Sequence, residues 1–407
     1  MQNSYSPRRM DASNLEPLPI LVFSNLVMVG FLFLLSRKGL REPYLFRPWR
    51  RWLILLVTLM FCLFSFWGTD WFHYAEMYFN ILYVNGFNTS LEPVYCFVAT
   101  ISSNYLVFRL IIWGTALFLL MLLFGHVSAP RDLLLAIFCS VWLIYFGYGR
   151  VVMAYTLMYL GGAVITKPLR GKVLLSLILG VTLILLSAFF HKSSFFGIAL
   201  VFLALLPRLL NKRTLLLALM AYPFMILSVQ LLLMQFMDSA FDPSDNSSYA
   251  TAGQIYLSED ASDIGIAYLL LLILEFTPYY MAAWIAYKAN SFRRDDAPSE
   301  TPPEGEEEEE GEGTQPAVPA DIRFFSRLLV YIVLVSTIFL FDLGANTLTL
   351  YIRFMMFGFL PICVILAWAW QHDFCPRMVK YTYLAGLAGT GYALLYSFYV
   401  AYLGVAE

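Results

Sequence analysis

Charged residues are scarce in this sequence. Only 13% of its 407 residues are Asp, Glu, Lys or Arg, and 60% are hydrophobic, whereas a soluble domain usually carries about 25% charged residues. So few charges cannot cover that much apolar surface in water, which excludes a water-soluble catalytic domain. The sequence also lacks a basic excess, with a formal net charge of −2, and its composition excludes a nucleic-acid-binding protein.

Cysteine is sparse and follows no ligand pattern. The five cysteines form no C-x-x-C or Cys/His spacing, so neither a disulfide framework nor a zinc site is predicted. Acidic residues gather between positions 238 and 263, but their spacing matches no calcium-binding loop. We therefore expect no metal ion and no cofactor.

Long apolar runs are what the sequence has in abundance. They extend for roughly 17–25 residues, the length needed to cross a bilayer as a helix, and lack the alternation of membrane β-strands. In hydrocarbon every backbone polar group needs an internal partner, which a helix provides. We predict an all-α, polytopic transmembrane bundle, forming one domain over residues 1–407, with about 12 spans near 18–36, 52–68, 105–124, 132–149, 151–166, 173–190, 194–210, 214–237, 266–287, 326–345, 349–370 and 379–403.

The distribution of Lys and Arg predicts the orientation of these spans. In the twelve-span arrangement, 20 of the 26 Lys and Arg residues fall on one side, which the positive-inside rule makes cytoplasmic. Both termini then face outward. The two longest loops between spans, 69–104 and 238–265, also face outward, and neither contains a Lys or Arg.

Segment 295–320 has a different composition from the rest of the chain. It contains Pro302 and Pro303, the acidic run Glu306–Glu310 and almost no apolar residue. Such a stretch buries too little surface to offset its chain entropy. We expect a disordered, acidic cytoplasmic linker.

Four cations fall on the predicted outer side, against the positive-inside bias. They are Arg109, Arg150, Lys192 and Arg353, each near the outer end of a helix. One Lys or Arg at a helix end often extends to the membrane surface. Four on one face indicate a binding pocket for an anion.

The first long outer loop supplies acids and aromatic rings. Asp70, His73, Tyr74 and Tyr78 have near-helical spacing, and Glu92 precedes Pro93 later in the loop. One helical turn can present such side chains together. Aromatic rings here suit the membrane interface, and together with acids and amides they also suit sugar binding.

The order of these motifs resembles the EpsG/Wzy group of bacterial exopolysaccharide and O-antigen polymerases. The resemblance covers roughly residues 50–370, and the chain has Val151 where the group often has Gln. The matching residues, in chain order, are Asp70 with Tyr74 and Tyr78, Glu92-Pro93, Arg150 with Ala154, His191-Lys192-Ser193, and Arg353.

The resemblance implies a multi-pass glycosyltransferase of the bacterial inner (plasma) membrane, with a GT-C-like or Wzy/ligase-like architecture. Its substrate would be an undecaprenyl-diphosphate-linked oligosaccharide in the bilayer, polymerised at the outer face into a surface polysaccharide. Arg150, Arg353 and Lys192 are the predicted diphosphate ligands, because guanidinium groups hold phosphates with two charge-assisted hydrogen bonds.

The predicted catalytic base is His191, with Asp70 or Glu92 as the next candidates, because the acceptor hydroxyl has to lose a proton. His73, Tyr74 and Tyr78 are the predicted sugar-binding residues. A chain-length regulator is a candidate partner that the sequence neither requires nor excludes.

Two other readings stay open. An O-antigen ligase or a polyprenyl-phosphate-dependent glycosyltransferase shares outer acids and arginines. A transporter of lipid-linked oligosaccharide predicts matching Gly/Pro-broken spans in two halves, which the sequence does not display. Charges within spans are also few, Glu275 and Asp342 being the main ones, and neither has an obvious partner in the sequence.

Overall fold

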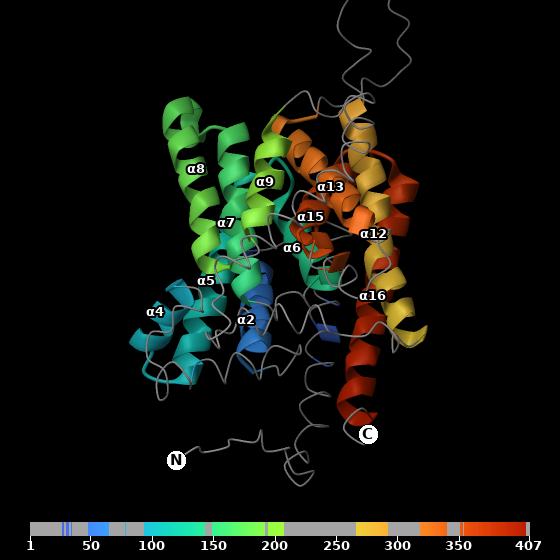
Figure 1. Ribbon diagram of the computed structural model, residues 1–407. Coiled ribbons are helices and arrows are strands. Elements are labelled where there is room, and N and C mark those ends of the chain that lie inside the picture. The colour runs from blue at the N-terminus through green and yellow to red at the C-terminus, as the bar shows by residue number, and fades with distance from the viewer. Residues whose placement is uncertain are drawn as a thin grey trace, which may run out of the picture.

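The computed structural model of the protein is helical throughout the part that it describes (Figure 1). No β-strand occurs in these residues. They are 27, 30–31, 34, 48–64, 78, 93–142, 149–191, 194–206, 266–291, 318–339, 351–352 and 354–403.

The helices follow one another in the order expected for an up-and-down bundle. Their bounds are α2 Pro48–Phe64, α4 Pro93–Ile101, α5 Tyr105–His126, α6 Arg131–Ile137 with the π-helical segment η4 Phe138–Trp142, α7 Gly149–Thr166, the short η6 Leu169–Gly171, α8 Val173–Phe190, α9 Ser194–Leu205, α12 Ile266–Ser291, α13 Ala320–Phe339, α15 Phe359–Gln371 and α16 Pro376–Leu403. All-helical structure was predicted and is confirmed for these residues.

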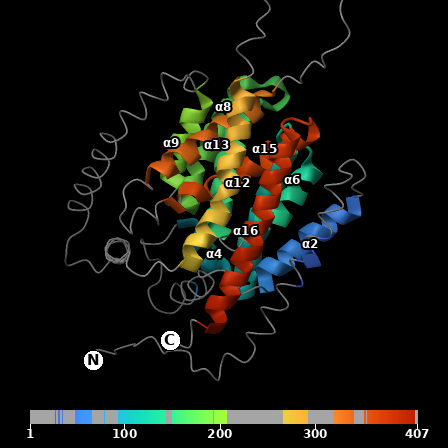
Figure 2. The ribbon, with the colours of Figure 1, turned by 90° about the vertical axis from the view of Figure 1, so that its right-hand side faces the viewer.

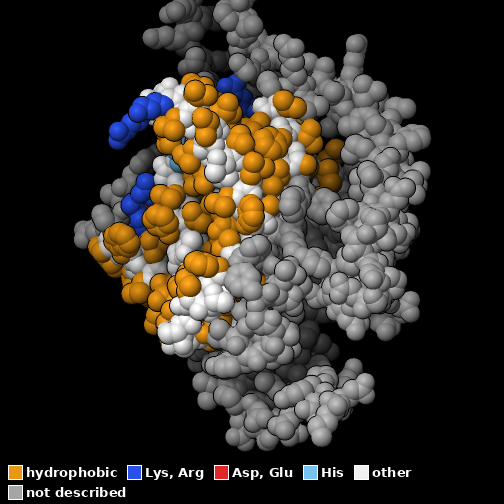
Figure 3. Space-filling model, turned by 60° about the vertical axis from the view of Figure 1, so that its left-hand side comes forward, with side chains coloured by type: hydrophobic (Ala, Val, Ile, Leu, Met, Phe, Trp, Pro, Cys, Tyr) orange, Lys and Arg blue, Asp and Glu red, His pale blue; other side chains and the backbone are white. Residues whose placement is uncertain are grey.

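Two of the described helices, α5 and α8, are long and apolar enough to cross a membrane by length and composition. Apolar stretches of α2, α7 and α15 are shorter. Hydrophobic side chains of α8 such as Leu174 and Ile178 are more than half exposed. Figure 3 shows hydrophobic side chains over most of the described surface on that side of the molecule, with Lys and Arg in the upper part of the view. This surface fits a lipid environment and not water.

Helix α7 lies at the centre of one half of the bundle, against α5, α8, α9 and α13. Its closest neighbour is α8, because two glycines face each other: a Cβ atom on Gly161 would lie 2.5 Å from the carbonyl oxygen of Gly180. Gly162 faces the ring of Phe324 in α13 in the same way. Small residues at such contacts let helix backbones approach closely, which is how many membrane helices pack.

Helices α12, α13 and α16 form the other half. Figure 2 shows α12 and α16 side by side. The hydroxyl of Tyr383 in α16 donates a hydrogen bond of 3.0 Å to Ser140 Oγ in η4, and Thr390 donates to the carbonyl of Val141. A π-helical turn leaves carbonyl groups without their usual helical partner, and α16 supplies a donor to one of them.

Most of the described Lys and Arg side chains gather where α5 and α7 end and α6 and α8 begin, which we call the basic end. Lys167 Nζ donates to the carbonyl of His126 at 2.8 Å, and Arg51 holds the Asp132 carboxylate through two hydrogen bonds of 2.7 and 2.9 Å. Asp321, at the start of α13, accepts from the backbone N–H of Ser128. The basic end lies toward the top of Figure 1, and it corresponds to the side predicted to be cytoplasmic.

Candidate functional site

His191 lies at the end of the bundle opposite the basic end, where α8 gives way to α9. Its backbone is extended and caps α8: the N–H donates to the carbonyl of Ser187 at 3.2 Å, and the carbonyl accepts from the N–H of Ser194 at 3.0 Å. The side chain is half-buried. The imidazole is thus held at a tight turn between two helices, close enough to the surface for a substrate to reach it.

Tyr155 of α7 brings three of the predicted motifs together. Its ring centroid lies 6.5 Å from that of His191. On its other side the ring stacks on Phe357 at 4.3 Å, with an interplanar angle of 25°. Tyr155 follows Arg150 by five residues on the same helix, and Phe357 follows Arg353 by four residues in the chain. The backbones that carry the Arg150, His191 and Arg353 motifs therefore meet at one ring.

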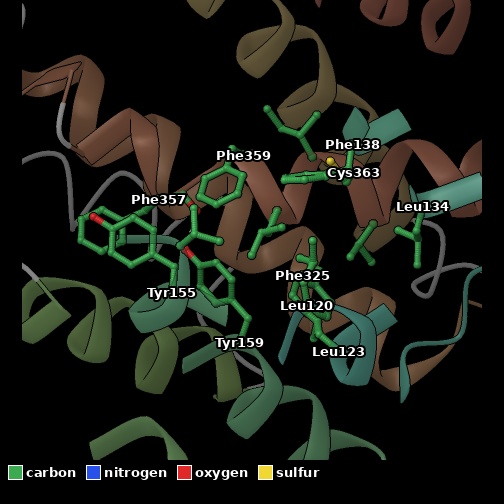
Figure 4. Packing of buried hydrophobic residues seen from close by; sticks show 14 of the residues in the cluster. Leu120, Leu123, Leu134, Phe138, Tyr155, Tyr159, Phe325, Phe357, Phe359 and Cys363 are labelled. Carbon is green, nitrogen blue, oxygen red and sulfur yellow. The ribbon is translucent and has the colours of Figure 1, made fainter. Parts of the chain in front are cut away.

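The contacts around Tyr155 hold this meeting point in place. The hydroxyl of Tyr159, one turn along α7, donates to the carbonyl of Phe357. A Cβ atom on Gly197 of α9 would collide with Phe357 and with Met158, so α9 packs against the same point. Figure 4 shows Tyr155, Tyr159, Phe357 and Phe359 grouped on one side of the buried cluster. We call Tyr155, His191 and Phe357 the aromatic junction.

The first turn of α7 contains Arg150. Its neighbour Gly149 packs on α5, where a Cβ atom would lie 3.0 Å from the indole of Trp113. The backbone of Arg150 is thereby fixed at the end of the bundle that carries His191. The side chain of Arg150 lies outside the described residues.

Arg109 is the outer cation whose contacts the structure describes. It is 6% exposed, donates to the carbonyl of Cys62 in α2, and lies 5.0 Å above the ring of Trp113 and 5.8 Å above that of Tyr105. A guanidinium held this way links α2 to α5 and supports the surface on which Gly149 packs.

Tyr78, predicted from the first outer loop as a sugar-binding residue, is 2% exposed. Its hydroxyl donates to the carbonyl of Ser102 at 3.3 Å, and its ring contacts Tyr105 and Phe108. In this structure Tyr78 packs the loop against α5, and its binding of sugar stays a prediction. Helix α4 shows that part of the 69–104 loop is folded.

The remaining predicted residues lie outside the described part of the chain: Asp70, His73, Tyr74, Glu92, Lys192 and Arg353. Among the described residues, no group of three or more His, Cys, Asp or Glu side chains is placed to hold a metal ion. The prediction of a metal-independent site is not tested by this.

Tyr155 and Phe357 were missed by the sequence reasoning. Each is an aromatic residue within an apolar segment, and such residues are usually core. The available signal was spacing, since each lies four or five residues after a predicted phosphate-binding arginine, on the following helical turn.

Comparison with known proteins identifies the family. The model of the EpsG family matches residues 49–294, which is more than half of the chain. No curated protein and no solved structure matches the sequence. The matched region contains the Arg150 and His191 motifs and both helices that are long and apolar enough to span a bilayer. The chain therefore belongs to the EpsG family and is a membrane protein of the polysaccharide-polymerase type.

Proposed function

We propose that the protein polymerises undecaprenyl-diphosphate-linked oligosaccharide repeat units at the outer face of the bacterial inner membrane. The observation that supports this most directly is the aromatic junction, where Tyr155 contacts both His191 and Phe357. A base and two arginine-bearing segments near one point are what transfer from a lipid diphosphate requires.

In the proposed reaction, a sugar C1–O bond to the diphosphate breaks and a bond from C1 to the acceptor hydroxyl oxygen forms. The electron pair of the broken bond leaves with the lipid diphosphate. Arg150 and Arg353 stabilise this growing negative charge, with Lys192 assisting, because fixed cations aimed at a developing charge lower the barrier by several kcal/mol. The amide groups in the first turn of α7 add a further partial positive charge.

The acceptor hydroxyl loses its proton in the same step. His191 accepts it in this proposal, since the ring is half-buried and lies beside the junction. Asp70 and Glu92 are the next candidates for the base, and His73 and Tyr74 are proposed to contact sugar from the same loop. The hydroxyl of Tyr78 is already bonded to Ser102, so we assign its contribution to holding that loop in place.

The deciding experiment uses purified full-length protein in a lipid bilayer. It is incubated with a polyprenyl-diphosphate oligosaccharide extracted from the source cells, and the products are separated by size. A ladder of products is expected. A single addition indicates a ligase or simple glycosyltransferase, and translocation across the bilayer without reaction indicates a transporter; either result contradicts the proposal.

A further inference from the structure

Three hydroxyl groups meet on the α12 side of the segment that precedes α15. Tyr280 of α12 lies with its hydroxyl 3.0 Å from Thr337 Oγ1 in α13 and 3.4 Å from the hydroxyl of Tyr351. Thr337 is two residues before the last residue of α13, at the end of the bundle that carries His191. We call Tyr280, Thr337 and Tyr351 the hydroxyl cluster.

The hydroxyl cluster and the aromatic junction flank the same stretch of chain. Tyr351 and Phe357 belong to that stretch, and the next residue, Gly358, packs directly on the ring of Tyr279 in α12. Tyr351 precedes Arg353 by two residues in the chain. A ligand at the hydroxyl cluster would therefore lie beside the proposed diphosphate site, on the side away from His191.

The hydrogen-bond directions decide what the cluster can bind. Thr337 donates its proton to the carbonyl of Val333 at 2.6 Å, so its oxygen accepts from Tyr280. The proton of Tyr280 is then used, and its oxygen is left to accept from Tyr351. With each proton engaged among the described residues, what the cluster offers a ligand is oxygen lone pairs.

Lone pairs select for a ligand that donates. Sugar hydroxyls donate, whereas the oxygens of an ionised diphosphate only accept. Glu275 of α12 reinforces this choice, because it acts electrostatically on Tyr351 and an ionised carboxylate repels phosphate while accepting from a hydroxyl. A carboxylate within an apolar membrane helix is costly and usually marks a functional position.

The geometry leaves room for such a ligand. Tyr280 is 37% exposed, and its 3.4 Å contact with Tyr351 is longer than a well-formed hydroxyl–hydroxyl bond. A ligand hydroxyl can therefore compete for it. The ring of Phe276 meets Tyr351 edge-on at 5.1 Å and holds that phenol in position.

We propose that the hydroxyl cluster, together with Glu275, binds a neutral sugar ring of the lipid-linked oligosaccharide and so positions the glycan beside the diphosphate site. This inference rests on the proposed function, whose substrate it subdivides into a diphosphate part and a sugar part with separate binding residues.

The test compares two ligands on conservative variants of the full-length protein in bilayer nanodiscs. The ligands are the polyprenyl-diphosphate oligosaccharide extracted from the source cells and the same polyprenyl diphosphate without sugar. Tyr280→Phe and Thr337→Val each remove one hydroxyl and keep the shape. We expect each to weaken binding of the sugar-bearing lipid about threefold to tenfold, with binding of the sugar-free lipid unchanged.

Matched controls come from the same helix. Tyr287→Phe and Thr277→Val remove an exposed phenol and an exposed threonine hydroxyl from α12, and both should bind the two lipids as wild type does. Equal weakening for both lipids would assign the cluster to the headgroup and overturn the proposal, as would unchanged binding of both.

A ladder assay on the same preparations separates this inference from the proposed function. If wild type makes a ladder while Tyr280→Phe binds both lipids normally, the sugar site is wrong and the polymerase stands. If wild type binds neither lipid, both are wrong.

Discussion

Tyr155 connects the predicted chemistry to the fold at the scale of single residues. It is 2% exposed and is the side chain that touches both His191 and Phe357. A buried ring of this kind sets the separation of the groups on either side of it. Its shape therefore matters more than its hydroxyl for keeping the base and the arginine-bearing segments in register.

Tyr155→Ala should disturb the site and the stability together, because removal of a buried aromatic ring leaves a cavity worth about 3–5 kcal/mol. We expect the midpoint of thermal unfolding to fall and polymer formation to be lost. Tyr155→Phe keeps the ring and should retain both properties, as measured by unfolding in detergent and by the product ladder. Equal loss of activity in the Phe variant would show that the hydroxyl is needed.

His191→Ala should slow turnover about 10²- to 10⁴-fold, the usual contribution of a general base. Binding of the lipid-linked donor should stay near the wild-type value, because the base is proposed to act on the acceptor. The two quantities are measured separately, by single-turnover kinetics and by equilibrium binding. Unchanged turnover would remove His191 as the base and leave Asp70 and Glu92.

Arg150→Ala and Arg353→Ala should each abolish polymer formation while the protein level in the membrane stays normal. The reason is loss of charge where the diphosphate leaves. Arg150→Lys keeps a positive charge but not the two-pronged hydrogen bond, so intermediate activity is expected. The checks are immunoblotting of membranes and the length of the polymer. Normal chain length in either Ala variant would refute its phosphate role.

At the scale of elements, the contact between α7 and α8 carries the Arg150 and His191 motifs together. The two helices approach at Gly161 and Gly180, where no added side-chain atom fits. Because Arg150 begins α7 and His191 caps α8, the spacing of these helices fixes the spacing of the two residues. The small residues of this contact are therefore functional at a distance.

Gly161→Val should push α7 from α8, since its added atoms meet the backbone of Gly180. Overpacking of this kind typically costs about 1–3 kcal/mol, and activity should fall with the shift of His191 relative to Arg150. Gly114→Ala in α5 is the matched control, because a Cβ atom there meets nothing within 4 Å. Unfolding midpoints and polymer yield are compared for both. A Gly161→Val protein with wild-type yield would show that the helix spacing is not limiting.

Helices were the part of the structure most predictable from the sequence. Apolar runs bounded by charges or by Gly147–Gly149 gave the positions of α5, α7 and α8 within a few residues, because backbone hydrogen bonding in lipid leaves helix as the available choice. Contacts between distant segments were not predictable. Nothing in the periodicity of α7 and the segment before α15 says that Tyr155 stacks on Phe357, or that Tyr280 meets Thr337 and Tyr351.

At the scale of the whole molecule, one cysteine can report which way the protein faces. Cys62, Cys96, Cys139 and Cys363 are buried, whereas Cys375, in the turn between α15 and α16, is half-buried. That turn lies at the basic end, where the charge of Lys288 acts on the thiol. Wild-type protein therefore offers one principal labelling position, on the side predicted to be cytoplasmic.

A membrane-impermeant maleimide should label Cys375 in inside-out vesicles and leave it unlabelled in intact spheroplasts. Burial raises the pKa of this thiol, an effect that Lys288 partly opposes. The reactive thiolate is thus rarer at neutral pH than for a free cysteine, and the labelling rate should keep rising as the pH passes the ordinary thiol range. Labelling is measured by gel shift, and Cys375→Ser, which should abolish it, is the control. Fast labelling of intact spheroplasts would place the basic end outside and move His191 to the cytoplasmic face, where no lipid-linked repeat unit could be polymerised for export.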